Sequence, residues 1–199
     1  MKRSVFVVLL HDPIVDRNGK EVITAVTNLD IHDIARSSKT YGVQKYFIVN
    51  PEDEQEKLVH NIVEHWKEDV YREYHPKRAQ ALDLVQFCRT FKEAMNEAER
   101  LAPGSGAPFV VMPDARALTS SISYAELRER IEGGMLGPQD VGTQSLVIVF
   151  GTGWGISPSF FNNVDAILMP LYSRREAVYN HLSVRAAAAI VLDRLFGKG

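Results

Sequence analysis

Several features that would point to particular protein classes are missing from this 199-residue sequence. It has a single cysteine, Cys88, so it cannot form an internal disulfide, and this composition suits a reducing cytoplasm. No apolar run is long enough to span a membrane. The N-terminal letters MKRSVFVVLL are basic and then apolar, but His11-Asp12-Pro13 follows in place of a small-residue cleavage site. We therefore expect a cytoplasmic protein whose N-terminus forms a buried strand.

Metal-ligand spacing and an excess of one charge are also missing from the sequence. No group of cysteine, histidine and carboxylate residues has the spacing of a metal site, so no bound metal is predicted. The formal net charge is −2, so contact with RNA would need a local basic patch. With 45% hydrophobic and 24% charged residues and no repeat or linker, residues 1–199 are expected to form one domain.

Short apolar runs alternate with amphipathic segments along the chain. The runs predict strands at 4–10, 46–49, 82–87, 108–112, 146–150 and 166–169. The intervening segments predict helices at 30–41, 50–71 and 90–101, one that begins after Ser123, and a last one that ends near Gly197. Residues 21–27 suit either a loop or a strand, and 75–80 are expected to be a polar connection. The alternation predicts an α/β fold with a mainly parallel sheet of about six strands and helices on both faces.

A glycine-rich segment follows the fifth expected strand. Gly151, Gly153 and Gly155 occupy alternate positions directly after that strand. Such glycines indicate that φ is positive or that another group approaches the main chain closely. Because ligands of open parallel sheets bind at the carboxyl ends of strands, the segment predicts a small-molecule site built largely from main chain. A tight turn with glycines for packing explains the same pattern equally well.

The glycine segment does not match the common nucleotide-binding motifs. Its spacing is G-x-G-x-G, whereas the dinucleotide fingerprint is G-x-G-x-x-G and follows the first strand of its unit. Only one further strand and one helix remain after it, which is too little for a complete βαβ unit. No G-x-x-x-x-G-K-[ST] phosphate loop is present. A nucleotide-dependent oxidoreductase is therefore disfavoured.

Three segments together resemble the motifs of one known superfamily. They are DIHDIARSSKTYGV at 30–43, which carries Arg36 and Gly42, then FGTGWGIS at 150–157, and ILMPLYS at 167–173 followed by NHLSVRAAAAI at 180–190. In this order they resemble the SPOUT superfamily of S-adenosylmethionine-dependent RNA methyltransferases. The resemblance implies a C-terminal trefoil knot, here within about 108–199, which is an exception to the rule against threaded chains.

The sequence departs from the superfamily pattern at three places. Asp30 stands where Asn is common, and Gly153 stands where Glu is frequent. The spacing from Asn180 to Ser183 is one residue longer than usual. These departures concern the chemistry of the methyl acceptor more than the binding of the cofactor.

The resemblance implies that S-adenosylmethionine lies among four loops, with backbone groups of Met169 and Leu182 against the adenine. Plain core packing is the alternative for Leu168, Met169, Leu171 and Leu182, and a turn role is the alternative for Asp114. The implied cofactor-binding residues are Met112, Asp114, Phe150, Gly151, Thr152, Gly153, Gly155, Ile156, Leu168, Met169, Pro170, Leu171, His181, Leu182 and Ser183.

The resemblance also implies the residues that act on RNA. Arg36, Asn180 and Ser183 are the implied catalytic residues, with Arg36 as a cation that binds RNA, and Arg174 and Arg175 are further RNA contacts. For the arginines, solvated surface positions or, for Arg36, an ion pair with the nearby Asp33 are the alternatives. For Asn180 and Ser183 the alternative is helix capping. A capping box that begins at Ser173 would start the last helix earlier, whereas the resemblance favours a loop up to about Leu182.

The last expected helix carries the alanine run 186–189, which allows close approach of another helix or a second subunit. The superfamily resemblance implies a homodimer formed through this helix. It also implies methyl transfer from S-adenosylmethionine to a base or ribose of tRNA or rRNA. The alternative is a non-catalytic module that binds S-adenosylmethionine or RNA on a knotted fold, since a fold alone does not define a function.

Overall fold

The computed structural model describes residues 3–116, 118, 120–138, 140, 142–173, 179 and 181–198. Three of the residues singled out from the sequence, Arg174, Arg175 and Asn180, lie outside the described residues. Everything below concerns the described part of the chain.

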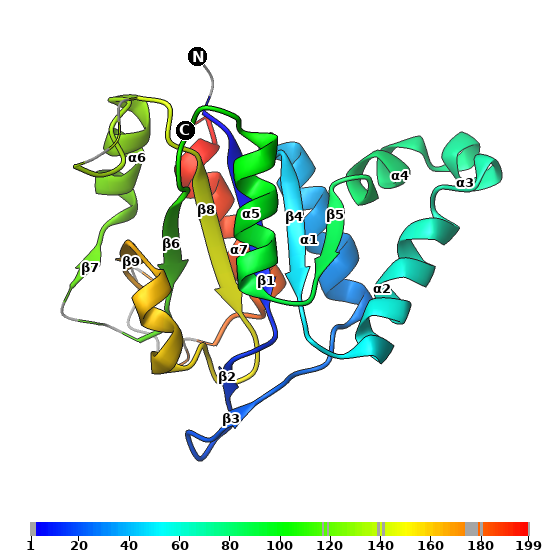
Figure 1. Cartoon of the computed structure of the whole chain (residues 1–199), viewed down its shortest axis with the longest axis horizontal. Helices are drawn as coiled ribbons and strands as arrows, with labels where there is room; N and C mark the ends of the chain where they lie inside the picture. The colour runs from blue at the N-terminus through cyan, green and yellow to red at the C-terminus, as the bar shows by residue number, and fades with distance from the viewer. Residues whose placement is uncertain are drawn as a thin grey trace.

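A sheet of seven parallel strands forms the centre of the structure (Figure 1). Its spatial order is β5-β4-β1-β8-β6-β9-β7, and β2 and β3 form a separate antiparallel pair. The expected mainly parallel sheet is confirmed, and β7 is a two-residue addition that is too short to recognise from sequence. The strands are β1 Val5–Leu10, β2 Ile14–Val15, β3 Glu21–Val22, β4 Lys45–Val49, β5 Val85–Cys88, β6 Phe109–Pro113, β7 Ser121–Ile122, β8 Leu146–Gly151 and β9 Ala166–Leu168.

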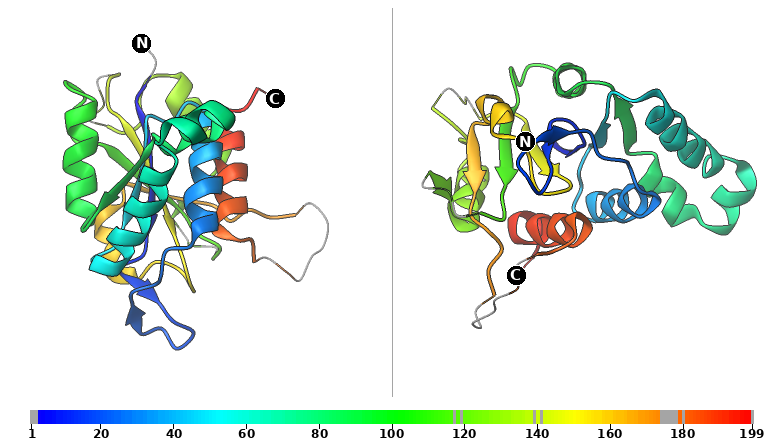
Figure 2. Two further views of the ribbon diagram at one scale, coloured as in Figure 1. Left: turned by 90° about the vertical axis from the view of Figure 1, so that its right-hand side faces the viewer. Right: turned by 90° about the horizontal axis from the view of Figure 1, so that it is seen from below.

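Alternate side chains of β1 enter two different cores. Val5, Val7 and Leu9 pack with one set of helices, whereas Phe6 and Val8 pack on the opposite face. The first face is covered by α1 Asn28–Thr40, α2 Asp53–His65, α4 Pro76–Leu82, α6 Tyr124–Glu132 and α7 Val184–Phe196. The second face is covered by α5 Phe91–Leu101 and the short 3₁₀ helix η1 Pro158–Asn163 (Figure 2). Strands that are buried on both sides are uniformly apolar, as the sequence runs predicted.

Several helices begin where the capping residues predicted. Thr90 caps α5 by accepting a hydrogen bond from Glu93 N, and Ser123 caps α6 in the same way from Glu126 N. Ser183 caps α7 by accepting from Ala186 N, so the last helix starts at Val184 and not near Ser173. Each such cap satisfies a backbone donor that the helix itself leaves free.

The long helix predicted over 50–71 is wrong. The helix α2 ends at His65, and a short α3 Asp69–Tyr74 and then α4 follow it. The break brings Trp66 against Tyr71, with ring centroids 5.5 Å apart, and against His75 at 5.9 Å. Pro76 is the first residue of α4, where its missing N–H costs nothing. The polar connection predicted over 75–80 is therefore a helix, and it buries Ala79 against the rest of the fold.

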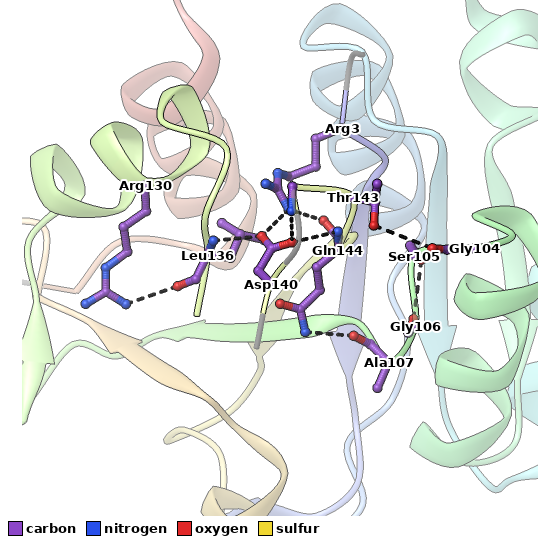
Figure 3. A network of polar contacts seen from close by, with 11 residues as sticks. Arg3, Gly104, Ser105, Gly106, Ala107, Arg130, Leu136, Asp140, Thr143 and Gln144 are labelled. Carbon is purple, nitrogen blue, oxygen red and sulfur yellow. Dashed lines mark hydrogen bonds and ion pairs between the residues drawn. The ribbon is translucent and has the colours of Figure 1, made fainter. Parts of the chain in front are cut away.

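A buried ion pair ties the N-terminal segment to the loop before β8 (Figure 3). Arg3 Nη1 lies 2.9 Å from Asp140 Oδ2 and also donates to the Gln144 carbonyl. The backbone N–H groups of Leu136, Gly142 and Gln144 also donate to this carboxylate. Burial alone would raise the pKa of Asp140, but these donors and Arg3 together lower it. The network therefore joins the residues before β1 to those before β8.

Candidate functional site

A large cavity lies at the carboxyl edge of the sheet, where ligands of parallel α/β folds bind. Its volume is about 1000 Å³, at the upper end for small-molecule sites. Loops after β6 and β8, the segment before α1, one residue of α6 and the start of α7 surround it. The lining residues are Thr24, Ala25, Thr27, Asp30, Met112, Pro113, Asp114, Ala115, Arg116, Tyr124, Phe150, Gly151, Thr152, Gly153, Trp154, Gly155, Ile156, Leu171, His181, Leu182, Ser183, Val184 and Ala187.

The glycine loop lines this cavity, and close packing and positive φ angles also favour glycine at its positions. A Cβ at Gly151 would lie 2.4 Å from Ile156 Cγ1. At Gly153, φ is +57° and a Cβ would meet Ile14 Cγ2 at 2.9 Å. Gly155 has a φ of +112° and bonds through its carbonyl to Val15 N. The packing-turn interpretation is therefore correct for the loop, which exposes main chain to the cavity as well. The same geometry explains why a side chain such as Glu does not fit at position 153.

A buried histidine supports two hydroxyl groups of the lining. His11 follows β1 and is fully buried, with Nδ1 3.0 Å from Thr24 Oγ1. Thr24 Oγ1 in turn lies 2.5 Å from Thr152 Oγ1 in the glycine loop. Burial lowers the pKa of His11 to about 4, so the ring is neutral near pH 7. Asn50, also buried, donates to the Thr24 carbonyl at 2.9 Å. These contacts fix two segments that are 128 residues apart in the chain.

Asp114 and Arg116 form a bidentate ion pair at the end of β6. Arg116 Nε and Nη2 lie 2.9 Å and 2.7 Å from the two carboxylate oxygens of Asp114, and Arg116 N also donates to Oδ1. Burial raises the pKa of Asp114, but the bonds from Arg116 outweigh that effect and lower it. Asp114 therefore has the turn role that is the alternative to cofactor binding in the sequence analysis. Arg116 itself also lines the cavity.

The start of α7 contacts the start of α1 beside the cavity. Arg185 Nε lies 3.6 Å from Asp30 Oδ1, and Arg185 Nη1 lies 3.6 Å from Asp33 Oδ2. Asp30 is nearly buried and also accepts from Thr27 Oγ1 at 2.6 Å. Ser183, which was predicted to be catalytic, is the N-cap of α7 and lines the cavity. Asp33 therefore pairs with Arg185, and not with Arg36, which was the partner that the sequence allowed.

The cavity brings together most of the residues that the resemblance implied for the cofactor. Three are outside its lining: Leu168, Met169 and Pro170. Leu168 is fully buried core. The N–H of Met169 donates to the Ile122 carbonyl at 2.9 Å, so only its carbonyl is left to contact an adenine, and its role stays a prediction. The lining residues implied by the resemblance are Met112, Asp114, Phe150, Gly151, Thr152, Gly153, Gly155, Ile156, Leu171, His181, Leu182 and Ser183.

Arg36 does not line this cavity. It is an exposed residue of α1, six positions beyond Asp30, which puts it about 9 Å further along the helix axis. It lines a second, smaller hollow together with residues 74–78. Its catalytic role stays a prediction.

Sequence reasoning missed Tyr124, Thr24, Thr27 and Ala187 as lining residues. Tyr124 is the most informative of them, because its buried hydroxyl has no hydrogen-bond partner among the described residues. Burial raises the pKa of Tyr124 to about 12, against a smaller opposing effect of Arg194. A buried hydroxyl without a partner is costly, which indicates that a bound group supplies the bond. They come from three parts of the chain, the segment before α1, α6 and the alanine run of α7, so no single sequence pattern groups them into one site.

The lining fits a nucleoside-like cofactor. Apolar walls at Met112, Phe150 and Leu182 suit an aromatic base, and the Thr152 and Tyr124 hydroxyls with exposed main chain suit its polar edges.

Within the part of the chain that the structure describes, no group of three or more His, Cys, Asp or Glu is placed to hold a metal ion. None of the described helices is long and apolar enough to cross a membrane.

Comparison with solved structures shows which fold this chain shares. A probable methyltransferase from Bordetella pertussis aligns with a TM-score of 0.58 at 16% identity, covering 98% of this chain and 94% of that one. The SpoU methyltransferase AviRb from Streptomyces viridochromogenes, solved with AdoMet, aligns with a TM-score of 0.53 at 16% identity, covering 98% and 60%. The fold is thus the SPOUT methyltransferase fold, as the sequence motifs predicted.

A model of the family described as SAM-dependent RNA methyltransferase matches residues 4–197. The chain therefore belongs to this family of S-adenosylmethionine-dependent RNA methyltransferases.

Two curated relatives differ in how much of them this chain covers. An uncharacterized protein of Aquifex aeolicus is 37% identical over 198 residues, which is 100% of this chain and 91% of that protein. A tRNA (guanine-N(1)-)-methyltransferase of Nitratidesulfovibrio vulgaris is 35% identical over 195 residues, 98% of this chain but only 42% of the relative. More than half of that longer relative has no counterpart in this chain.

Proposed function

We propose that the cavity at the carboxyl edge binds S-adenosylmethionine and that this chain methylates a base or ribose of tRNA. The observation that carries the proposal is the family match over 4–197, together with a cavity lined by the glycine loop and the start of α7. The bound cofactor supplies an electrophilic methyl group on a sulfonium. The protein then has to bind the cofactor, exclude water and hold the acceptor atom in line with the methyl group.

The proposed roles follow from where the lining residues lie. Main chain at Gly151–Ile156 contacts the cofactor closely, and apolar side chains flank its base. The Tyr124 hydroxyl gains a hydrogen bond that no other described residue supplies. Ser183 and Asn180, just before α7, contact the acceptor nucleotide or the cofactor. Arg36, Arg174 and Arg175 contact RNA phosphates.

The choice of tRNA rests on the named relatives. The protein of Nitratidesulfovibrio vulgaris and another of Oleidesulfovibrio alaskensis, 33% identical over 195 residues, are both called tRNA (guanine-N(1)-)-methyltransferases. This chain spans 42% of each, so the position and atom in their name are not transferred to it. Ribosomal RNA is the second substrate class to test.

Further features of the proposal concern the whole protein. We propose that residues 1–199 form one domain in the cytoplasm, with a trefoil knot in the C-terminal part and a homodimer formed through α7. The superfamily resemblance supports the knot and the homodimer, whereas the composition and the single cysteine support one domain in the cytoplasm. Exposed apolar side chains near the cavity, among them Trp154 at 68% and Leu182 at 49% exposure, support a partner surface in that region.

The test is methyl transfer from isotopically labelled S-adenosylmethionine to RNA. Bulk tRNA and rRNA from cells that lack the gene would be incubated with the protein, digested to nucleosides and analysed by mass spectrometry. We expect label in a single nucleoside of the tRNA fraction. Label confined to rRNA would overturn the choice of tRNA. Tight cofactor binding without label in either RNA would favour the non-catalytic binding module.

A further inference from the structure

A second hollow, of about 290 Å³, lies between α1 and the α3–α4 turn. Its lining is rich in cations and aromatic groups: Arg36, Tyr74, His75, Pro76, Lys77 and Arg78. We propose that this hollow binds the phosphate backbone of the substrate RNA, with an unpaired base stacked on Tyr74. The inference rests on the proposed RNA substrate and adds a binding site outside the methyl-transfer cavity.

The cations of the hollow have no acidic partners among the contacts of the described residues, whereas neighbouring cations do. Arg72 pairs with Asp83 at 2.9 Å, and Lys67 pairs with Glu64 at 2.7 Å. Arg36 and Lys77 are exposed without an ion pair in the described part of the chain. Cations that are solvated and unpaired bind phosphate without first breaking another contact.

Arg78 is held in place by an aromatic cluster. Its guanidinium lies over the Trp66 ring, 4.7 Å from the centroid. Trp66 in turn contacts His75, and its ring packs edge-on to His32 with centroids 5.7 Å apart. Burial and the charges of Arg78 and Arg36 lower the pKa of His32, against an opposing effect of Asp33. A pre-positioned arginine loses less entropy on binding than a free one.

Tyr74 gives the hollow an aromatic surface. Tyr74 is 75% exposed, which is among the largest exposed fractions of the apolar and aromatic residues that the structure describes. A base stacked on an exposed aromatic ring gains affinity without sequence specificity. The combination of stacking surface and unpaired cations is typical of single-stranded nucleic-acid sites and unlike the apolar, enclosed lining expected for a small metabolite.

The hollow lies within reach of the methyl-transfer cavity. Helix α1 packs against α7 on one side and α4 on the other, and Figure 2 shows the three side by side on one face of the sheet. The first turn of α1 lines the cavity at Asp30, and Arg36 lies about 9 Å further along the axis. The six positions also leave Arg36 about 120° around the helix from Asp30, so the path between the two sites is longer than this axial rise. Stacked nucleotides advance about 3.4 Å each, so at least about three nucleotides span it. One RNA strand can therefore occupy both sites, which gives a chain of net charge −2 a local basic contact.

The experiment measures RNA affinity by fluorescence anisotropy with an unmodified tRNA transcript. The variants are Lys77→Glu, which reverses an unpaired charge, and Tyr74→Ala, which removes the stacking surface. Lys92→Glu on α5 is the matched control, because Lys92 is also exposed but lies on the opposite face of the sheet. Calorimetry with S-adenosylmethionine accompanies each variant and reports whether the methyl-transfer cavity is intact.

We expect Lys77→Glu to raise the Kd for tRNA about 10-fold and to reduce the slope of log Kd against log salt by on the order of 0.7. Tyr74→Ala should raise the Kd about 5-fold. Both variants should bind S-adenosylmethionine like wild type, and Lys92→Glu should change RNA affinity less than about 2-fold.

These measurements distinguish failure of the RNA-binding hollow from failure of the proposed methyl transfer. If wild type binds and methylates tRNA but Lys77→Glu loses no more affinity than Lys92→Glu, the hollow is not an RNA site and the proposed function stands. If the variants weaken RNA binding but wild type transfers no methyl group to any RNA, the hollow stands and the proposed activity fails. If wild type binds no RNA, both are wrong.

Discussion

At the scale of single residues, the cavity is defined by polar groups that come from unrelated parts of the chain. Tyr124 belongs to α6, Thr24 precedes α1 and Thr152 follows β8. The hydroxyl of Tyr124 is buried without a partner among the residues that the structure describes, whereas the other two bond each other. This difference makes Tyr124 the residue at which ligand binding and folding stability are most easily separated.

Tyr124→Phe should weaken cofactor binding without destabilising the protein. The lost hydroxyl bonds nothing in the described protein, so the free energy of unfolding should change by less than about 0.5 kcal/mol or rise slightly. Loss of one hydrogen bond to the cofactor should raise the Kd for S-adenosylmethionine roughly 5-fold, about 1 kcal/mol. Calorimetry and urea unfolding measure the two quantities. Unchanged affinity with unchanged stability would show that the hydroxyl does not meet the cofactor.

His11 should make stability depend on pH. Its folded pKa of about 4 lies below the ordinary value of 6.5, so the unfolded state binds the proton more readily. The free energy of unfolding should therefore fall as pH decreases from 6.5 to 4, by roughly 3 kcal/mol from this group alone. Burial also lowers the pKa of His32, which adds a change of the same sign.

Comparison with His11→Asn isolates this contribution. The variant should be less stable at pH 7, because it leaves a cavity, yet it should lose less stability between pH 6.5 and 4 than wild type. His60→Asn, at an exposed histidine, is the matched control and should follow the wild-type curve. If the free energy of unfolding depends on pH equally in His11→Asn and wild type, the lowered pKa of His11 is contradicted.

Among the site residues, the sequence predicted those whose chemistry is visible locally. Alternate glycines after a strand marked the loop at Gly151–Gly155, and it does line the cavity. Tyr124 could not be predicted, because nothing in its own segment separates it from an ordinary core tyrosine. The sequence also could not show that the N–H of Met169 bonds to the Ile122 carbonyl, because that pairing depends on strand order.

At the scale of elements, local capping signals were more reliable than helix lengths. Ser183 begins α7 as a cap, and Thr90 and Ser123 begin α5 and α6. The helix predicted over 50–71 failed because apolar spacing continues past His65 while the chain turns there. That turn is stabilised by packing of Trp66 on rings beyond the break, an interaction that periodicity does not encode.

The loop before β8 should depend strongly on its buried ion pair. Asp140→Asn keeps the shape but leaves the guanidinium of Arg3, whose side chain is 7% exposed, without its counter-charge. The free energy of unfolding should fall by about 3 kcal/mol, since breaking a buried pair strands a charge. Asp83→Asn, in the exposed pair with Arg72, should cost less than about 1 kcal/mol. Chemical denaturation measures both, and equal losses would contradict the structural role of Asp140.

At the scale of the whole molecule, strand and helix alternation was enough to predict a parallel sheet covered on both faces. It could not predict the order β5-β4-β1-β8-β6-β9-β7, because that order depends on which edges the later strands join. The motifs that resembled the SPOUT superfamily supplied the class of fold, which the comparisons with solved structures confirm.

The proposed homodimer through α7 is testable by hydrodynamics. Ala186, Ala189 and Ile190 remain only half-buried in the single chain, which leaves a small apolar strip on α7. Ala189→Arg should convert a dimer to a monomer in sedimentation velocity while the circular dichroism spectrum is retained. Asn96→Arg, on the exposed side of α5, is the control and should remain dimeric. A wild-type monomer at micromolar concentration would contradict the dimer.

The central claim is that the carboxyl-edge cavity is the S-adenosylmethionine site, and calorimetric titration tests it most directly. Wild type would be titrated with S-adenosylmethionine and, in parallel, with NADH, together with Ala187→Leu, which adds bulk to a lining position at the start of α7. We predict one S-adenosylmethionine bound per chain, no binding of NADH, and at least a 10-fold loss of affinity in Ala187→Leu. Binding of NADH in place of S-adenosylmethionine, or full affinity in the variant, would contradict the account.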